Sequence, residues 1–179
     1  LGLLSLLSKK ERIIILAYHR VTEENDFIAK GMGGINVTRE NFESHIRYLK
    51  KNYSIVSLDN LAEFFNKGSA LPRKSAIITF DDGYLDNYTD AFKILKSHNV
   101  PATIFLMTDF IGGEKIMWRH KNYYNACYKQ AMNSAEEKVL ASKIYLNWQQ
   151  VIEMGQAGIS IGSHAASHQI LSQLEERVV

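Results

Sequence analysis

The fold of this 179-residue chain is decided by the stretch SAIITFDDGY, residues 75–84. Its first six residues, 75–80, form a continuous apolar run of strand length, which predicts a buried strand. Asp81-Asp82-Gly83 follows at once and predicts a turn. Ligands of parallel α/β sheets bind at the edge where such turns leave the strands, so the two aspartates are candidate functional residues.

Other segments repeat the pattern of a short apolar run followed by a helical pattern, which predicts a parallel sheet with helices packed against it. The remaining expected strands are 13–18, 53–56, 103–106 and 159–163. We expect an α/β fold, a distorted and incomplete (β/α) barrel, because a full barrel needs about 200 residues or more. Residues 1–10 form a separate N-terminal segment, residues 11–179 the domain, and residues near 112–146 a helical insertion.

The C-terminus carries a helix start signal. Ser172-Gln173-Leu174-Glu175 fits a capping box, which predicts a helix beginning there. Only a few residues follow it, so we expect the fold to be truncated at this end.

Composition excludes several classes of protein. The 21 Lys and Arg nearly balance the 19 Asp and Glu, without runs of like charge, so we do not expect nucleic acid binding. The longest apolar run, 13–18, is far shorter than a transmembrane segment. The single cysteine, Cys127, excludes an internal disulfide and a thiolate metal cluster, and we expect it to be buried.

A second cluster of functional residue types follows the predicted strand 159–163. His164 and His168 are four residues apart, a spacing that on a helical turn would let both imidazoles reach one metal. The aspartate pair by itself is more often ordinary turn chemistry, but both clusters fall at the same edge of the predicted sheet. Together they predict a site in which one carboxylate binds a cation and the other accepts a proton.

The order and spacing of these motifs resemble those of the polysaccharide deacetylases, the NodB homology domain or carbohydrate esterase family 4. Thr79–Gly83 resembles the first family motif and His164–His168 the second, with similar flanking segments at 17–21 and 100–105. The resemblance covers most of the chain, from Ile13 to Leu174. It implies that residues 11–179 are the N-terminal part of a deacetylase catalytic domain with a distorted barrel fold.

The same resemblance implies a chemistry for these residues. Asp82, His164 and His168 would bind a divalent metal, usually zinc, although iron, cobalt or nickel also suit this ligand set. Metal-bound water would attack the acetyl carbonyl of an N-acetyl (or O-acetyl) group on a polysaccharide containing N-acetylglucosamine, with Asp81 as general base. The family further implies the cell envelope or the extracellular space.

Several residues could have either a functional or a structural role. His19, at the end of the first strand, either lines the same site and contacts substrate or is a structural histidine. His45, His98 and His120 are expected in surface or packing roles. The aromatic side chains of the insertion either pack between helices or stack on sugar rings; they are Trp118, Tyr123 and Tyr124.

Two departures from the family pattern shape the functional prediction. Ala165 stands where the family commonly has Ser or Thr, and the later motifs, which supply an arginine and a general-acid histidine, are absent. We therefore expect the chain to bind metal but to deacetylate slowly or not at all. The alternatives are a catalytically silent metal-binding carbohydrate-binding or interaction domain, which would not need Asp81, and an iron oxygenase, whose usual all-β fold disagrees with the β-helix-β pattern.

Overall fold

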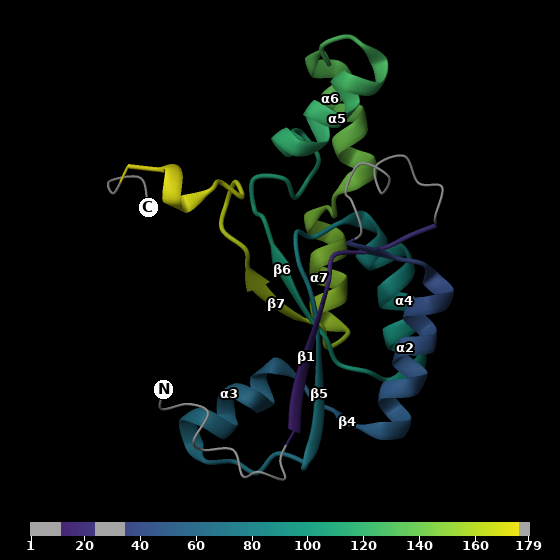
Figure 1. Cartoon of the computed structure of the whole chain (residues 1–179), viewed down its shortest axis with the longest axis vertical. Coiled ribbons are helices and arrows are strands. Elements are labelled where there is room, and N and C mark those ends of the chain that lie inside the picture. Colours follow the sequence, from purple (N-terminus) through teal and green to yellow (C-terminus); the bar gives the residue numbers. More distant parts are fainter. Residues whose placement is uncertain (1–11, 24–34, 176–179) are drawn as a thin grey trace.

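The computed structural model describes residues 12–23 and 35–175, in which a parallel sheet is flanked by helices (Figure 1). The main sheet has the strand order β1 (Arg12–Tyr18), β5 (Lys74–Phe80), β6 (Thr103–Leu106) and β7 (Ser160–Ser163), and β4 (Ser54–Ile55) pairs with β5. Every pair in this sheet is parallel. The described strands do not close into a barrel, so the predicted incomplete (β/α) architecture is confirmed.

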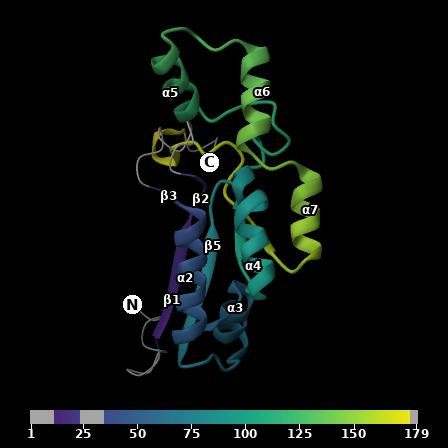
Figure 2. The ribbon, with the colours of Figure 1, turned by 90° about the vertical axis from the view of Figure 1, so that its right-hand side faces the viewer.

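Three helices cover one face of the sheet: α2 (Arg39–Asn52), α4 (Phe92–His98) and α7 (Trp148–Gln156) (Figure 2). Their apolar stripes pack on alternate residues of β5 to form the main core. The helix starts follow from local capping, because Thr38 and Asn147 each accept a hydrogen bond from the backbone of the first turn. Another helix, α3 (Leu58–Lys67), begins at a capping box on Ser57 and ends at Gly68.

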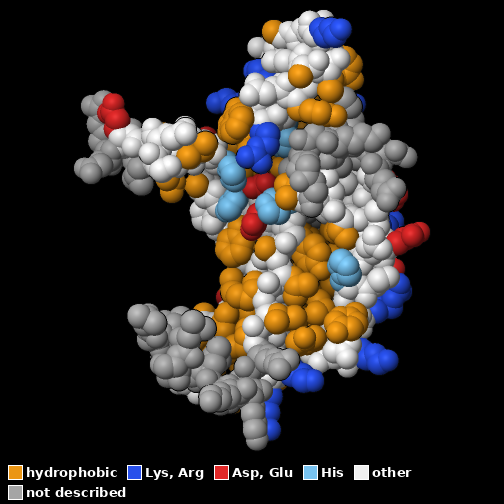
Figure 3. Space-filling model, in the orientation of Figure 1, with side chains coloured by type: hydrophobic (Ala, Val, Ile, Leu, Met, Phe, Trp, Pro, Cys, Tyr) orange, Lys and Arg blue, Asp and Glu red, His pale blue; other side chains and the backbone are white. Residues whose placement is uncertain are grey.

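The opposite face of the sheet is only partly open among the described residues. Ile15 of the edge strand β1 is 53% exposed, but its register partner Ile77 of β5 is only 1% exposed. Figure 3 shows apolar side chains on this side of the molecule, next to a group of histidine and acidic side chains. One face of the sheet is therefore a helix-covered core, and the other exposes apolar side chains at the edge strand β1 but not at the centre.

The segment expected to be a helical insertion contains α5 (Trp118–Tyr128) and α6 (Ser134–Ile144), which stand beyond one end of the sheet (Figure 1). They have a core of their own around Tyr84 and Tyr145, which also form an antiparallel bridge. None of the helices in ranges 12–23 and 35–175 is both long and apolar enough to cross a membrane.

Two sequence predictions are wrong. Cys127 is exposed, because the buried position on α5 belongs to His120, which has hydrogen-bond partners there. The capping box at Ser172 does not start an α-helix: a 3₁₀ helix, η3 (Leu171–Gln173), ends at Leu174 in an extended conformation. Leu171 is 57% exposed and so lacks the apolar packing that stabilises a short helix. The N-terminal segment 1–10 lies outside the described residues.

Candidate metal centre

The predicted site residues meet at the carboxyl edge of the sheet. Asp81 and Asp82 follow β5, His164 follows β7, and His19 follows β1. Hydrogen bonds continue just past the strand ends: the N–H of Asp81 donates to the last carbonyl of β1 and that of His164 to the last carbonyl of β6, both at 2.9 Å. The functional side chains therefore leave the sheet from fixed backbone positions.

Three ligand atoms converge in the structure. Asp82 Oδ1 lies 3.4 Å from His164 Nε2 and 3.6 Å from His168 Nε2. Ligand bonds of about 2.0–2.1 Å in a tetrahedral zinc site place neighbouring ligand atoms about 3.3 Å apart, close to these distances. Figure 3 shows histidine and acidic side chains gathered on this face. The three residues thus have the composition and spacing of a metal site.

The carboxylate of Asp82 also has an unsatisfied oxygen. Asp82 is 3% exposed, and its Oδ1 has no hydrogen-bond partner in the described part of the chain. Leaving a buried charged oxygen without a partner is costly, and a cation between it and the two imidazoles would remove that cost. The donor set therefore fits a divalent metal.

The loop 164–168 is not the helical turn that the histidine spacing predicted. Ala165 has φ 59°, His168 has φ 52° and Asp82 has φ 74°, a backbone region that costs non-glycine residues about 1–2 kcal/mol. The N–H of Asp109 donates to the carbonyl of Ala166 at 3.0 Å and helps to hold the loop. Such strained backbone concentrates at functional sites, where the surrounding structure enforces it.

Asp81 lies outside the group of three ligands. Its side chain is 22% exposed, and its Oδ2 is 3.9 Å from Nε2 of His19, whose side chain is 29% exposed. Both groups therefore face solvent beside the buried carboxylate of Asp82. The two adjacent aspartates have different environments, which allows different roles.

A sequence model of the family described as polysaccharide deacetylase matches residues 68–179. The chain belongs to the polysaccharide deacetylase family. The Bacillus subtilis (strain 168) protein YxkH is 30% identical over 167 residues, which are 93% of this chain and 47% of YxkH. A poly-beta-1,6-N-acetyl-D-glucosamine N-deacetylase of Staphylococcus epidermidis is 35% identical over 113 residues, 58% of this chain and 39% of the relative.

Solved structures agree with this assignment. A de-N-acetylase from Aggregatibacter actinomycetemcomitans matches with a TM-score of 0.62 and 26% identity, over 86% of this chain and 53% of that structure. The chain thus spans about half or less of the length of the curated relatives reported above.

This member of the deacetylase family has a buried polar network around His120 of α5. Nε2 of His120 lies 3.3 Å from the Tyr84 hydroxyl, and Nδ1 of His120 lies 2.9 Å from the Tyr145 hydroxyl. The N–H of Met117 donates to the Tyr145 oxygen at 3.2 Å. Burial lowers the pKa of His120 to about 4, so the imidazole is neutral near pH 7. Sequence reasoning gave His120 only a surface or packing role.

Tyr84 lies two residues after the candidate ligand Asp82. Burial, and after it the negative charge of Asp82, raises the pKa of Tyr84 far above its usual value. Burial likewise raises the pKa of Tyr145. Both phenols are therefore protonated near pH 7.

A buried ion pair supports the same region. Arg20 Nε donates to Asp86 Oδ2 at 2.7 Å, and the side chains are 5% and 7% exposed. The N–H of Val21 donates to the other carboxylate oxygen, and the Arg20 guanidinium lies 5.3 Å from the centre of the Tyr84 ring. Asp86 directly precedes a π-helix, η2 (Asn87–Ala91), which the sequence did not predict. Pairing across 66 residues leaves no local sequence signal.

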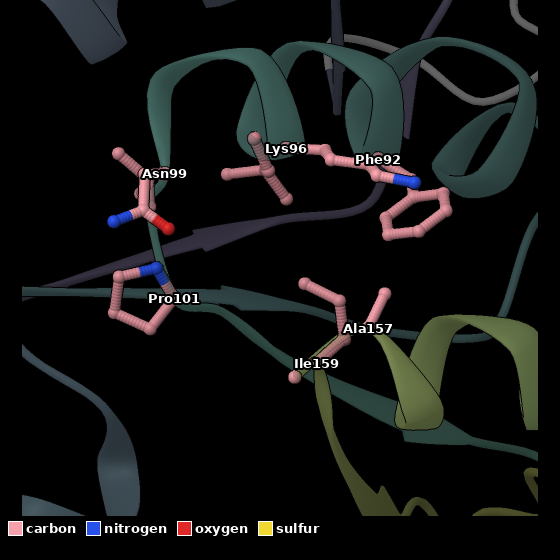
Figure 4. A pocket seen from close by; sticks show the side chains of 9 residues that line it. Phe92, Lys96, Asn99, Pro101, Ala157 and Ile159 are labelled. Carbon is pink, nitrogen blue, oxygen red and sulfur yellow. The ribbon is translucent and has the colours of Figure 1, made fainter.

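A cavity of about 290 Å³ lies elsewhere in the deacetylase fold, between α4 and the start of β7 (Figure 4). Its lining includes Phe92, Lys96, Pro101 and Ile159, at the opposite end of the strands from Asp82. Ligands of parallel sheets usually bind at the carboxyl edge, and this cavity lies at the other edge, away from the candidate metal centre.

Of the aromatic side chains of the insertion, Tyr124 packs against its neighbours and Trp118 is exposed. Tyr124 packs against the insertion core and its ring centre is 4.4 Å from that of Tyr128, while Trp118 is 50% exposed. Stacking of Trp118 on a sugar ring stays a hypothesis.

Proposed function

We propose that this chain binds a divalent metal through Asp82, His164 and His168 and removes acetyl groups from a polysaccharide. The observation that carries the proposal is the convergence of two imidazoles on a buried carboxylate oxygen that has no other partner in the described ranges. Zinc suits this donor set best, and iron, cobalt or nickel are the other candidates.

We infer the substrate class from the relatives. Several of the matched proteins are named as deacetylases of poly-beta-1,6-N-acetyl-D-glucosamine. We therefore propose the acetamido group of N-acetylglucosamine residues as the bond attacked, with O-acetyl esters as the second choice. A polysaccharide of this kind places the activity at the cell envelope or outside the cell.

The two aspartates divide the chemistry. A divalent metal, when bound, supplies a Lewis acid that polarises a carbonyl and lowers the pKa of water. Asp82 is buried against the imidazoles and acts as a ligand, whereas Asp81 faces solvent and accepts the proton of the attacking water. The water oxygen adds to the acetyl carbonyl carbon, the carbon–nitrogen bond breaks, and the proton that Asp81 took from the water passes to the amine nitrogen. His19, beside Asp81, faces the incoming substrate.

Metal content and acetate release from β-1,6-linked N-acetylglucosamine oligomers test this function together. We expect the unaltered chain to bind metal and to release acetate slowly, Asp82→Asn to lose both, and Asp81→Asn to keep the metal but lose the slow acetate release. Glu114→Gln is the matched control, because Glu114 is an exposed acid that pairs with the exposed Lys138.

Two outcomes contradict the proposal in different ways. Acetate release that is unaffected by Asp81→Asn would show that Asp81 is not the general base. Metal binding without acetate release from any oligomer would favour the silent metal-binding domain instead.

A further inference from the structure

We propose that Asp86 and Asn87 are positioning residues, which fix the backbone at His19 so that its imidazole stays beside Asp81. The inference rests on the proposed function, because His19 and Asp81 belong to the same candidate site. It assigns a role to two buried polar residues that lie outside the two deacetylase motifs.

His19 stands where the chain passes from one sheet to another. It is the single residue between β1 of the main sheet and β2 (Arg20–Val21), which pairs with β3 (Asn36–Val37) in a separate two-stranded sheet. A residue at such a junction lies outside both strand ladders, so its conformation has to be fixed by other contacts.

Asp86 binds the two residues that follow His19. Its Oδ2 accepts from Arg20 Nε at 2.7 Å, and its Oδ1 accepts from the backbone N–H of Val21 at 3.1 Å. Arg20 is 4% exposed and Asp86 is 6% exposed. Hydrogen bonds to an ionised group are stronger than those between neutral groups, so the carboxylate holds this segment firmly.

Asn87 binds His19 itself. Its Nδ2 donates to the backbone carbonyl of His19 at 2.8 Å and to Asp86 Oδ1 at 3.2 Å. Both partners only accept, so the amide must present its nitrogen to them. The two N–H groups of Asn87 therefore join the His19 backbone to the Asp86 carboxylate.

The other end of the Asn87 amide shows that these donors have a cost. Asn87 is fully buried, and its Oδ1 has no hydrogen-bond partner in the described part of the chain. A buried acceptor without a partner lowers stability, and an apolar side chain would avoid that loss. Asn87 is also the first residue of the π-helix η2, and π-helical turns are frequent at functional sites.

The clamp formed by these four hydrogen bonds joins the two parts of the site. Asp81 and Asp86 lie in the same connection after β5, and the N–H of Asp81 donates to the carbonyl of Tyr18 at 2.9 Å. The backbone on both sides of His19 is thus tied to the connection that carries Asp81, whose Oδ2 lies 3.9 Å from His19 Nε2. Misplacing a group at a reaction site by about 1 Å can lower the rate about 100-fold.

Ring signals of His19 in ¹H–¹³C spectra test the clamp without relying on activity. Asn87→Leu removes the amide and keeps its branched shape, and Asn87→Ala is made beside it so that the result does not depend on how leucine packs. We expect both variants to shift or broaden the His19 signals, which His19→Gln identifies by their loss. Ser75→Ala is the matched control: Ser75 is fully buried and its Oγ donates to the carbonyl of Pro72 at 2.8 Å, but at the other end of β5, so the His19 signals should not change.

A double-mutant cycle connects the clamp to the reaction. We expect Asn87→Leu to keep the bound metal but to lower kcat/KM for acetate release from β-1,6-linked N-acetylglucosamine oligomers about 10-fold or more. Because Asn87 acts through His19, the same substitution should cause almost no further loss in a His19→Gln chain. Ser75→Ala should leave kcat/KM unchanged.

The outcomes separate this inference from the function beneath it. Unchanged His19 signals in a folded Asn87→Leu chain, or an equal fold-loss of kcat/KM with and without His19, would overturn the positioning role and leave the metal centre intact. No metal binding and no acetate release by the unaltered chain would overturn the proposed function, and this inference with it.

Discussion

Gly83→Ala should destabilise the fold by about 3 kcal/mol, because both its backbone and its surroundings are restrictive. Gly83 has φ +70°, a conformation that costs an L-residue about 1–2 kcal/mol. Alanine also lowers the conformational entropy of the unfolded chain, which offsets about 0.4–1 kcal/mol of that cost. An added Cβ would lie 2.7 Å from Cδ2 of Leu106 and 3.0 Å from Cδ1 of Ile111, both buried. Such overpacking adds about 1–3 kcal/mol.

Gly68→Ala provides the matched control. Gly68 has nearly the same φ, +69°, but an added Cβ there meets no atom of the described residues within 4 Å. Gly68→Ala should cost only about 1 kcal/mol, so its loss of stability measures the cost of the backbone conformation alone. Urea unfolding followed by circular dichroism measures both variants. If the two substitutions cost the same within about 0.5 kcal/mol, the packing argument at Gly83 is wrong.

Three further predictions follow from the buried groups and the metal. Burial lowers the pKa of His120 to about 4, whereas the imidazole of the unfolded chain titrates near 6.5. The free energy of unfolding should therefore fall by about 3 kcal/mol as the pH drops from about 6.5 to about 4, because the unfolded chain binds the proton first. In urea unfolding, His120→Gln should show a flatter pH dependence. Asp86→Asn should cost about 3 kcal/mol by leaving the buried Arg20 poorly paired, whereas Glu63→Gln, which breaks an exposed pair, should cost less than about 1 kcal/mol; equal losses would contradict this difference. Chelation should lower the thermal unfolding midpoint of the metal-loaded chain, because a ligand at about 100 times its Kd adds about 2.7 kcal/mol to folded-state stability; an unchanged midpoint would indicate that no metal is bound by the native fold.

The sheet was predictable because its signals are local. The apolar run at 75–80 became β5 with one added residue, and the runs at 13–18 and 103–106 also became strands. Parallel strands share an edge, so the sequence also predicted that Asp82 and His164 would lie close together, and the structure places them so.

The features that were missed depend on long-range contacts. The four-residue spacing of His164 and His168 suggested a helical turn, but the strained loop is imposed by its contact with the segment after β6. The sequence gave no signal that His120 is a buried hydrogen-bonding group, because its partners Tyr84 and Tyr145 lie 36 and 25 residues away. Periodicity reports which side of an element is apolar, and it does not report which buried polar groups meet across elements.

Metal content of the purified chain, measured beside Asp82→Asn, tests the central claim most directly. We expect about one divalent ion per folded unaltered chain and almost none on the variant, because Asp82 supplies the buried oxygen near the two imidazoles. A folded, unaltered chain that takes up no divalent ion, or a variant that binds it equally well, would contradict the account.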